Sequence, residues 1–102
     1  MRTDQFEGIL DAQIQRIRDV LVVKAAEYAT EDTLANFRKV ANLRSCTVPQ
    51  AISGMMAKHT VSIYDMVESG HSFDIAQWDE KITDHLNYLI LLRASLAETS
   101  SS

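Results

Sequence analysis

The segment 74–96 constrains the fold most strongly, because its hydrophobic residues recur every three or four positions. This spacing places them along one side of a helix, and we expect that side to be buried. Asp84 and Asn87 lie at the margin of the row, where a carboxylate without a partner would be costly. We therefore expect both residues to have polar partners in a site. The hydrophobic row consists of Ile75, Trp78, Ile82, Leu86, Leu89, Leu92 and Leu96.

Two earlier segments share this helical periodicity. Residues 4–28 contain no proline and keep a helical spacing of apolar residues, so they predict a long first helix. Residues 31–44 predict a second helix. We expect Thr30 to cap it, with Glu31 and Asp32 in its first turn, where the helix dipole favours negative charge.

A third helix is predicted from Thr47 to Glu68. Thr47 and Gln50 have the spacing of a capping box, in which each side chain binds the backbone of the other residue. Gly54 lowers helix propensity, so we expect it to allow a close contact with another helix or a ligand. The polar residues 69–72 interrupt the pattern, and Ser72 or Asp74 is expected to cap the last helix.

These segments predict an all-α fold without strands. Short connections between about four helices are typical of a compact bundle. We expect a single domain over residues 1–97, followed by a flexible polar tail over residues 98–102. The turn from Tyr88 to Leu92 is apolar on nearly every side, and the third helix is rich in methionine. Four short helices cannot cover so many apolar faces, so we expect a homo-oligomer, with a dimer as the simplest form.

Composition excludes several functional classes. Ten basic and fourteen acidic residues give a net charge of −4, which argues against a general nucleic-acid binder with a broad basic face. Cys46 is the single cysteine, so an internal disulfide and a cysteine-rich zinc site are excluded. No segment approaches the run of about 18 apolar residues needed to span a bilayer, and the N-terminus does not resemble a secretory signal. We therefore expect a cytoplasmic protein without a membrane partner.

The sequence lacks the common signatures of catalysis. It has no phosphate loop, no nucleophile elbow and no pair of histidines at zinc spacing. Glu80 and Asp84 are one helical turn apart, a spacing at which two carboxylates can share a divalent cation. The alternative is a solvated acidic face with a salt bridge to Lys81. We expect no cofactor, with magnesium as a candidate only if the protein is an enzyme.

Four short motifs together resemble a known family. The chain is similar to small phage-encoded helical proteins called nucleotide modification associated, which in turn resemble the MazG-like all-α nucleotide pyrophosphohydrolases. The resemblance covers about residues 20–96. The motifs are Lys24-x-x-x-Tyr28, Asn36-Phe37, Met55-Met-x-Lys58-His59 and Trp78-Asp-Glu-Lys81-Ile-x-Asp84-x-x-Asn87-Tyr88.

The resemblance implies a ligand site and a MazG-like arrangement of helices. Carried over residue by residue, the site consists of Lys24, Tyr28, Asn36, Lys58, Asp84, Asn87 and Tyr88. MazG-type hydrolysis depends on Glu-Glu-x-x-Glu on one helix facing Glu-x-x-Asp on the next, and this chain has neither motif. Lysines, tyrosines and amides around one acid suit the binding of a phosphorylated base better than the activation of water. Binding without turnover is therefore favoured.

Three functions follow as hypotheses. The first is a phage-type protein that binds a nucleotide or cyclic nucleotide, either in nucleotide metabolism or to sequester a signal of host defence. The second is an interaction module that inhibits a host defence protein, for example an anti-CRISPR protein. The third is a magnesium-dependent nucleotide pyrophosphohydrolase. For a phage-encoded protein, each would act in the host cytoplasm.

The first hypothesis predicts that Lys24, Lys58 and Asp84 converge. Each lies at the border between an apolar and a polar stripe, on three different helices. The two lysines would then contact phosphate, and Tyr28 or Tyr88 would supply a face for the base. A purely structural ion pair between Lys58 and Asp84 is the alternative.

Overall fold

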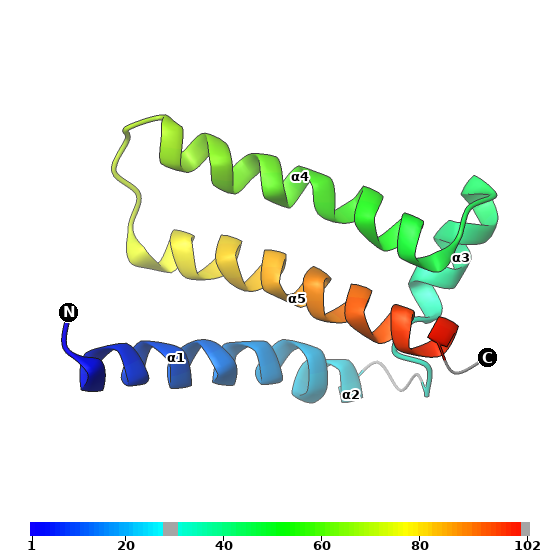
Figure 1. The fold of residues 1–102 in the computed structure, drawn as a ribbon, viewed down its shortest axis with the longest axis horizontal. Helices are drawn as coiled ribbons and strands as arrows, with labels where there is room; N and C mark the ends of the chain where they lie inside the picture. The colour runs from blue at the N-terminus through cyan, green and yellow to red at the C-terminus, as the bar shows by residue number, and fades with distance from the viewer. Residues whose placement is uncertain (28–30, 101–102) are drawn as a thin grey trace. The chain divides into compact units, whose positions relative to one another are not determined.

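The computed structural model describes residues 1–27 and 31–100, and every regular element within these ranges is a helix (Figure 1). The all-α prediction is therefore confirmed. The described residues form four helical segments, close to the predicted ranges, and the first segment is divided into three consecutive elements. The elements are α1 (Thr3–Arg18), a π-helical turn (Asp19–Lys24), α2 (Ala25–Glu27), α3 (Ala35–Arg44), α4 (Val48–Glu68) and α5 (Ile75–Ser100).

The contacts within the chain define two compact units, Met1–Glu31 and Asp32–Ser102. In the first unit, α1 continues directly through the π-helical turn into α2. One side-chain hydrogen bond supports the start of α1, because the backbone N–H of Arg2 donates to Gln5 Oε1 at 3.0 Å. In a π-helical turn the hydrogen bonds span five residues instead of four, so the regular helical spacing assumed for residues 19–24 does not hold there.

In the second unit, α4 and α5 form an antiparallel hairpin, and α3 packs against the first part of α4 (Figure 1). The core lies mainly where α3 meets α4. Its buried apolar side chains among the described residues are Leu34, Ala41, Ala51 and Ile52. Ile52 is fully buried, whereas both alanines contribute little apolar area, so the described residues of this unit form only a small core.

Tyr88 of α5 connects all three helices of this unit. Its ring meets the edge of Phe37 from α3 at a centroid distance of 6.1 Å. On α4, the ring of His59 lies 4.9 Å from Tyr88 with an interplanar angle of 31°. A second link joins the hairpin, since Thr60 Oγ1 and His85 Nε2 are 2.8 Å apart. Together these contacts fix which side of α5 faces α4.

The prediction that the hydrophobic row of the last helix is buried is wrong for four of its residues. Ile75, Ile82, Leu89 and Leu96 have exposed fractions of 74, 37, 42 and 44%. Trp78, Leu86 and Leu92 are half-buried. The reason is that α4 packs against the neighbouring side of α5, through His85 and Tyr88. Periodicity identifies a row of apolar residues, but another element must be present to cover it.

The second helix begins later than predicted. Glu31 and Asp32 precede α3 instead of lying in its first turn. The carboxylate of Asp32 accepts the backbone N–H of Leu34 at 3.0 Å, and its carbonyl accepts that of Ala35 at 3.1 Å. Asp32 thus forms a turn before the helix. Thr30, the expected cap, lies outside the described residues.

The predicted starts of the third and last helices are confirmed, whereas the last helix continues to Ser100, into the segment expected to be a tail. Thr47 Oγ1 accepts the backbone N–H of Gln50 at 3.2 Å, while Gln50 Oε1 accepts that of Thr47 at 2.9 Å. Asp74 and Gln77 make the same reciprocal pair at the start of α5, at 2.8 and 3.2 Å. Gly70 has a φ of 69°, a left-handed conformation that favours glycine after a helix end.

Gly54 allows the close contact expected of it, and the group that approaches is the side chain of Arg44. A Cβ atom at Gly54 would lie 2.6 Å from Arg44 Nη1. Because this guanidinium is the end of a flexible side chain, we expect Gly54→Ala to displace it and to raise the free energy of unfolding by up to about 1 kcal/mol through helix propensity. Urea unfolding would check this. A loss of stability would show that Arg44 is held firmly against the glycine.

Arg38 joins the start of α3 to the end of α5. Its Nε donates to Asp32 Oδ2 at 2.6 Å, and its Nη2 donates to Glu98 Oε1 at 2.7 Å. The bond from Arg38 lowers the pKa of Asp32 below its ordinary value, with help from the backbone N–H of Leu34. The Arg38 pKa is raised in turn, chiefly by Asp32.

The lowered pKa of Asp32 predicts a loss of stability in acid. The unfolded chain binds a proton at Asp32 at a higher pH than the folded chain does, so acidification favours unfolding. The contribution is complete above the unfolded pKa of about 4 and is lost as the pH falls through the folded value. We expect Asp32→Asn to flatten the dependence of the melting temperature on pH below about 4. A variant whose melting temperature falls in acid as steeply as that of the wild type would contradict this assignment.

Candidate functional site

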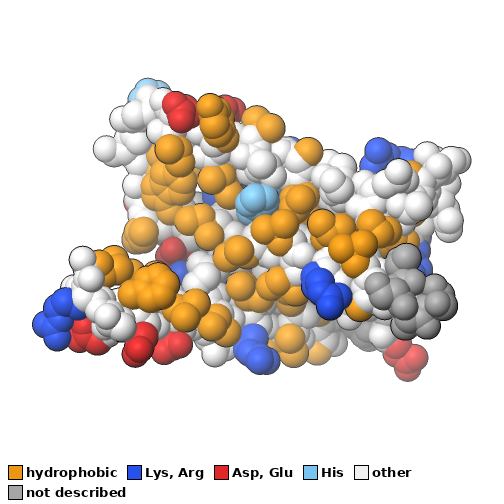
Figure 2. All heavy atoms as spheres, viewed as in Figure 1, with side chains coloured by type: hydrophobic (Ala, Val, Ile, Leu, Met, Phe, Trp, Pro, Cys, Tyr) orange, Lys and Arg blue, Asp and Glu red, His pale blue; other side chains and the backbone are white. Residues whose placement is uncertain are grey.

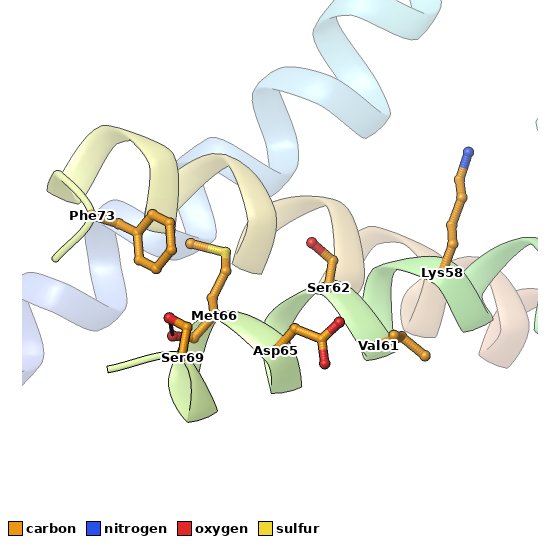
Figure 3. Close-up of a pocket in the computed structure, with 7 residues that line it drawn as sticks. All are labelled: Lys58, Val61, Ser62, Asp65, Met66, Ser69 and Phe73. Carbon is orange, nitrogen blue, oxygen red and sulfur yellow. Dashed lines mark hydrogen bonds between the residues drawn. The ribbon is translucent and has the colours of Figure 1, made fainter. Parts of the chain in front are cut away.

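An open groove lies along the second half of α4 near its connection to α5 (Figure 3). It has a volume of about 590 Å³, which falls in the range of small-ligand sites. Its lining comprises Lys58, Val61, Ser62, Asp65, Met66, Ser69 and Phe73. A second hollow of about 280 Å³ shares Ser62, Met66 and Phe73, and adds Gln77, Glu80 and Lys81 from α5. We call the two hollows together the hairpin groove.

Helical spacing explains why these residues lie together. Lys58, Ser62, Asp65 and Ser69 follow one another at steps of three or four, so they share one side of α4. Gln77 and Lys81 are one turn apart on α5. Because the hairpin brings these two helices side by side, groups of both contribute to one groove.

The end of the groove near the connection is mainly apolar. The side chains of Phe73 and Met66 point toward each other there (Figure 3). Trp78 supports the Phe73 ring in an edge-to-face contact at a centroid distance of 5.8 Å. Ser69 ends α4 beside them, and its hydroxyl donates to the carbonyl of Met66 at 2.9 Å. The Phe73 ring is thus held in place by Trp78 and forms an apolar side of the groove.

The charged groups of the groove are available for a ligand. Lys58 is exposed and extends away from α4 at the far end from Phe73 (Figure 3), while Lys81 is half-buried. Within the described ranges, neither lysine takes part in an ion pair or a side-chain hydrogen bond. The same holds for the carboxylates of Asp65 and Glu80. The groove therefore offers two ammonium donors and two carboxylate acceptors.

Three predicted site residues lie on α5 outside the lining of this groove, namely Asp84, Asn87 and Tyr88. Asp84 is half-buried, and the described part of the chain contains no ion pair between it and Lys58. The structural ion pair considered as an alternative is therefore absent there. Asn87 is 6% exposed, and its Oδ1 has no hydrogen-bond partner among the described residues. The expected partners of Asp84 and Asn87 are thus not found in those residues.

Tyr88 has a packing role in the structure. Phe37 and His59 both contact its ring, so these two side chains occupy ring surface that a stacked base would need. Asn36, which precedes Phe37, is exposed on α3 and does not line the hairpin groove. Lys24 belongs to the first unit, where it is exposed at the end of the π-helical turn. Tyr28 lies outside the described residues.

Glu80 and Asp84 were the candidate pair for a metal ion. Glu80 lines the groove, whereas Asp84 does not. Across residues 1–27 and 31–98, no cluster of three or more histidine, cysteine or carboxylate side chains is placed to hold a metal ion. In the same part of the chain, no helix combines the length and apolar character needed to cross a bilayer.

Sequence reasoning identified Lys58 but missed several groove residues that follow it. Ser62 and Asp65 lie one and two turns after Lys58, and this polar spacing is a signal that could have been used. Lys81 lies in the motif that begins at Trp78, but it was not assigned to the ligand site. Phe73 has no such signal, because it lies in the connection and its place depends on how the chain turns between α4 and α5.

Comparison with protein families, with characterised proteins and with solved structures gives no match for this chain.

Proposed function

We propose that this chain is a nucleotide-binding protein and that the hairpin groove is its binding site. The observation that carries the proposal is the position of Lys58 and Lys81. Two lysines from neighbouring helices border connected hollows, and no described acid neutralises either of them by an ion pair. Ammonium groups placed in this way can bind a phosphate through charge-assisted hydrogen bonds.

The remaining groups of the groove suit the other parts of a nucleotide. Phe73 and Met66 offer an apolar and polarisable surface for a base. Asp65 and Glu80 can accept hydrogen bonds from ribose hydroxyls or from an exocyclic amine. Ser62 and Gln77 add donors and acceptors between the two ends. A nucleotide would lie with its base toward Phe73 and its phosphate toward the lysines.

The proposed role is that of a phage-type protein related to the nucleotide modification associated and MazG-like families. Support comes from two quoted motifs, because Lys58, Glu80 and Lys81 belong to them and also line the groove. Binding, in nucleotide metabolism or to sequester a signal of host defence, is proposed in preference to hydrolysis. The sequence lacks the paired carboxylate motifs on which MazG-type hydrolysis depends.

A thermal-shift screen of mono-, tri- and cyclic nucleotides, with and without magnesium, tests the proposal. A ligand at a hundredfold its Kd stabilises the folded state by about 2.7 kcal/mol. This corresponds to a rise in melting temperature on the order of 10 °C for a domain of about 100 residues. Release of pyrophosphate with magnesium would favour the hydrolase instead. A screen without any shift would contradict the proposal and favour the inhibitor of a host defence protein.

Removing a groove lysine should weaken binding without unfolding the protein. We expect Lys58→Ala and Lys81→Ala each to raise the Kd by about 10- to 100-fold, since a hydrogen bond to a charged group contributes about 1.5–3 kcal/mol. Lys39 is an exposed lysine of α3 outside the groove, so Lys39→Ala is the matched control. Calorimetric titration with the nucleotide from the screen gives the Kd of each variant. Equal Kd values for all three variants would exclude this site.

A further inference from the structure

Residues 33–64 have a charge pattern unlike that of the rest of the chain. They include four of the ten basic residues and none of the fourteen acidic ones. The segment covers α3 and most of α4. Figure 2 shows Lys and Arg side chains, and no Asp or Glu side chain, on the visible surface where α3 adjoins α4. A chain with a net charge of −4 therefore contains a basic region. Its basic residues are Arg38, Lys39, Arg44 and Lys58.

These basic residues differ in whether an acid neutralises them. Arg38 is neutralised by two carboxylates. Considering residues 32–98 alone, Lys39, Arg44 and Lys58 form no ion pair. Arg44 and Lys58 also make no side-chain hydrogen bond within that range. Their charges are therefore available to an anion, which would form charge-assisted hydrogen bonds with them.

Gly54 determines where the Arg44 guanidinium lies. A Cβ atom at Gly54 would be 2.6 Å from Arg44 Nη1 and 3.5 Å from Arg44 Cζ. The guanidinium therefore lies directly on the backbone of α4, in space that the side chain of any other residue would occupy. Glycine in a helix interior lowers stability, and a close contact of this kind is a reason for its presence.

Lys58 lies next to this guanidinium. It follows Gly54 by four residues, so both share one side of α4. Side chains on a helix lean toward its N-terminus, which directs the Lys58 side chain toward Gly54. Figure 3 shows Lys58 at the end of the hairpin groove opposite Phe73, with its side chain extending away from the other lining residues. A guanidinium and an ammonium thus border the same end of the groove.

We propose that Arg44 and Lys58 bind the terminal phosphate of a nucleoside polyphosphate. This inference rests on the proposed function of the hairpin groove, and it names the class of nucleotide that the groove takes. A terminal phosphate carries about two negative charges at neutral pH, which these two cations balance. Its oxygens also match the planar fork of a guanidinium, which binds them bidentately.

The length of the groove favours two or three phosphates over one. A base beside Phe73 lies next to Met66, which is twelve residues after Gly54. At a rise of about 1.5 Å per residue, this separation is about 18 Å along α4. The phosphate of a monophosphate is attached directly to the ribose, so it would not reach Arg44. A longer phosphate chain extends toward Arg44, and Lys81 can contact the phosphates nearer the ribose.

Calorimetric titration with a nucleoside triphosphate, and with the monophosphate of the same base, tests this inference. We expect Arg44→Gln to raise the Kd of the triphosphate by about 10- to 100-fold and to leave that of the monophosphate unchanged. Gly54→Ala keeps every charge but displaces the guanidinium, so it should also raise the Kd of the triphosphate. The control is Lys39→Gln, which removes an exposed charge of the same region and should change neither Kd.

The outcome for Arg44→Gln separates this inference from the proposed function. Equal losses for both nucleotides would overturn the inference, and so would an unchanged Kd for the triphosphate. In either case the nucleotides still bind, so the proposed function would stand.

Inorganic pyrophosphate tests the site without a base. The NMR signal of the Arg44 Nε–Hε group should shift saturably with pyrophosphate, and sodium chloride at equal ionic strength should not reproduce the shift. Lys58→Gln should weaken this response, whereas Lys39→Gln should preserve it. A saturable shift supports the phosphate site even where the nucleotide screen fails. An unresponsive Arg44 signal, as expected if an acid of the unit Met1–Glu31 pairs with this residue, would overturn the inference even where nucleotides bind.

Discussion

Ile52→Ala should lower the free energy of unfolding by about 2–5 kcal/mol, the range measured for large-to-small changes in protein cores. Ile52 is the one large side chain that is fully buried in the described part of the chain, and it lies near the start of α4, where α3 packs. Truncation removes apolar contacts and leaves a cavity that the neighbouring helices fill only in part. Since small domains are stable by only about 5–15 kcal/mol, the loss would be a large fraction of the total.

Chemical denaturation followed by circular dichroism measures this loss. Leu43→Ala provides the control, because Leu43 is 87% exposed and its truncation removes almost no buried area. We expect the control to change stability by less than about 0.5 kcal/mol. A change of the same size in both variants would mean that the core is not located between α3 and α4.

Tyr88→Ala is expected to cost about 3 kcal/mol, near the lower end for an aromatic residue because Tyr88 is half-buried. The substitution removes the edge contact with Phe37 and the tilted ring contact with His59 in one step. Since these contacts connect α5 to α3 and α4, we expect unfolding to remain a single transition at a lower denaturant concentration.

Two variants separate this packing role from other effects. Tyr88→Phe keeps the ring and should be almost neutral, because the described residues offer the Tyr88 hydroxyl no hydrogen-bond partner. Tyr64→Ala removes an equally large ring that is 65% exposed on α4, so its effect on stability should be small. If Tyr88→Phe is as destabilising as Tyr88→Ala, the hydroxyl and not the ring supports the fold.

Much of the fold could be predicted from local signals. Thr47 with Gln50 starts α4, and Asp74 starts α5, since a capping side chain acts on backbone groups only two or three residues away. Gly70 follows the end of α4 in a left-handed backbone conformation, which favours glycine. The start of α3 was placed too early because Arg38, one turn into the helix, holds Asp32 in a preceding turn. Helix and capping propensities describe neighbouring residues only, so they do not predict this contact between residues six positions apart.

The covered side of α5 could not be predicted in the same way. Periodicity grouped Leu86 and Leu89 in one row, but only Leu86 is half-buried, while Leu89 is 42% exposed. Leu89 therefore does not belong to the buried core of the described residues.

The candidate groove shares only one residue with the ligand site expected from the sequence. Lys58 was singled out as a phosphate-binding residue, and it does line the hairpin groove. The expected convergence with Asp84 depended on how α4 and α5 face each other, which no spacing within one helix determines. The groove instead combines Lys58 with Lys81 and Phe73, residues whose proximity arises from the turn of the hairpin.

An amide-resolved NMR titration with the nucleotide found in the screen tests the central claim most directly. If the ligand binds in the hairpin groove, the largest chemical-shift changes should lie in residues 58–69 and 73–81. Amides at the start of α4, from Val48 to Ile52, lie outside the groove lining and should change little. Saturable changes centred on α3 or on the start of α4, with residues 58–81 unaffected, would contradict the proposed site.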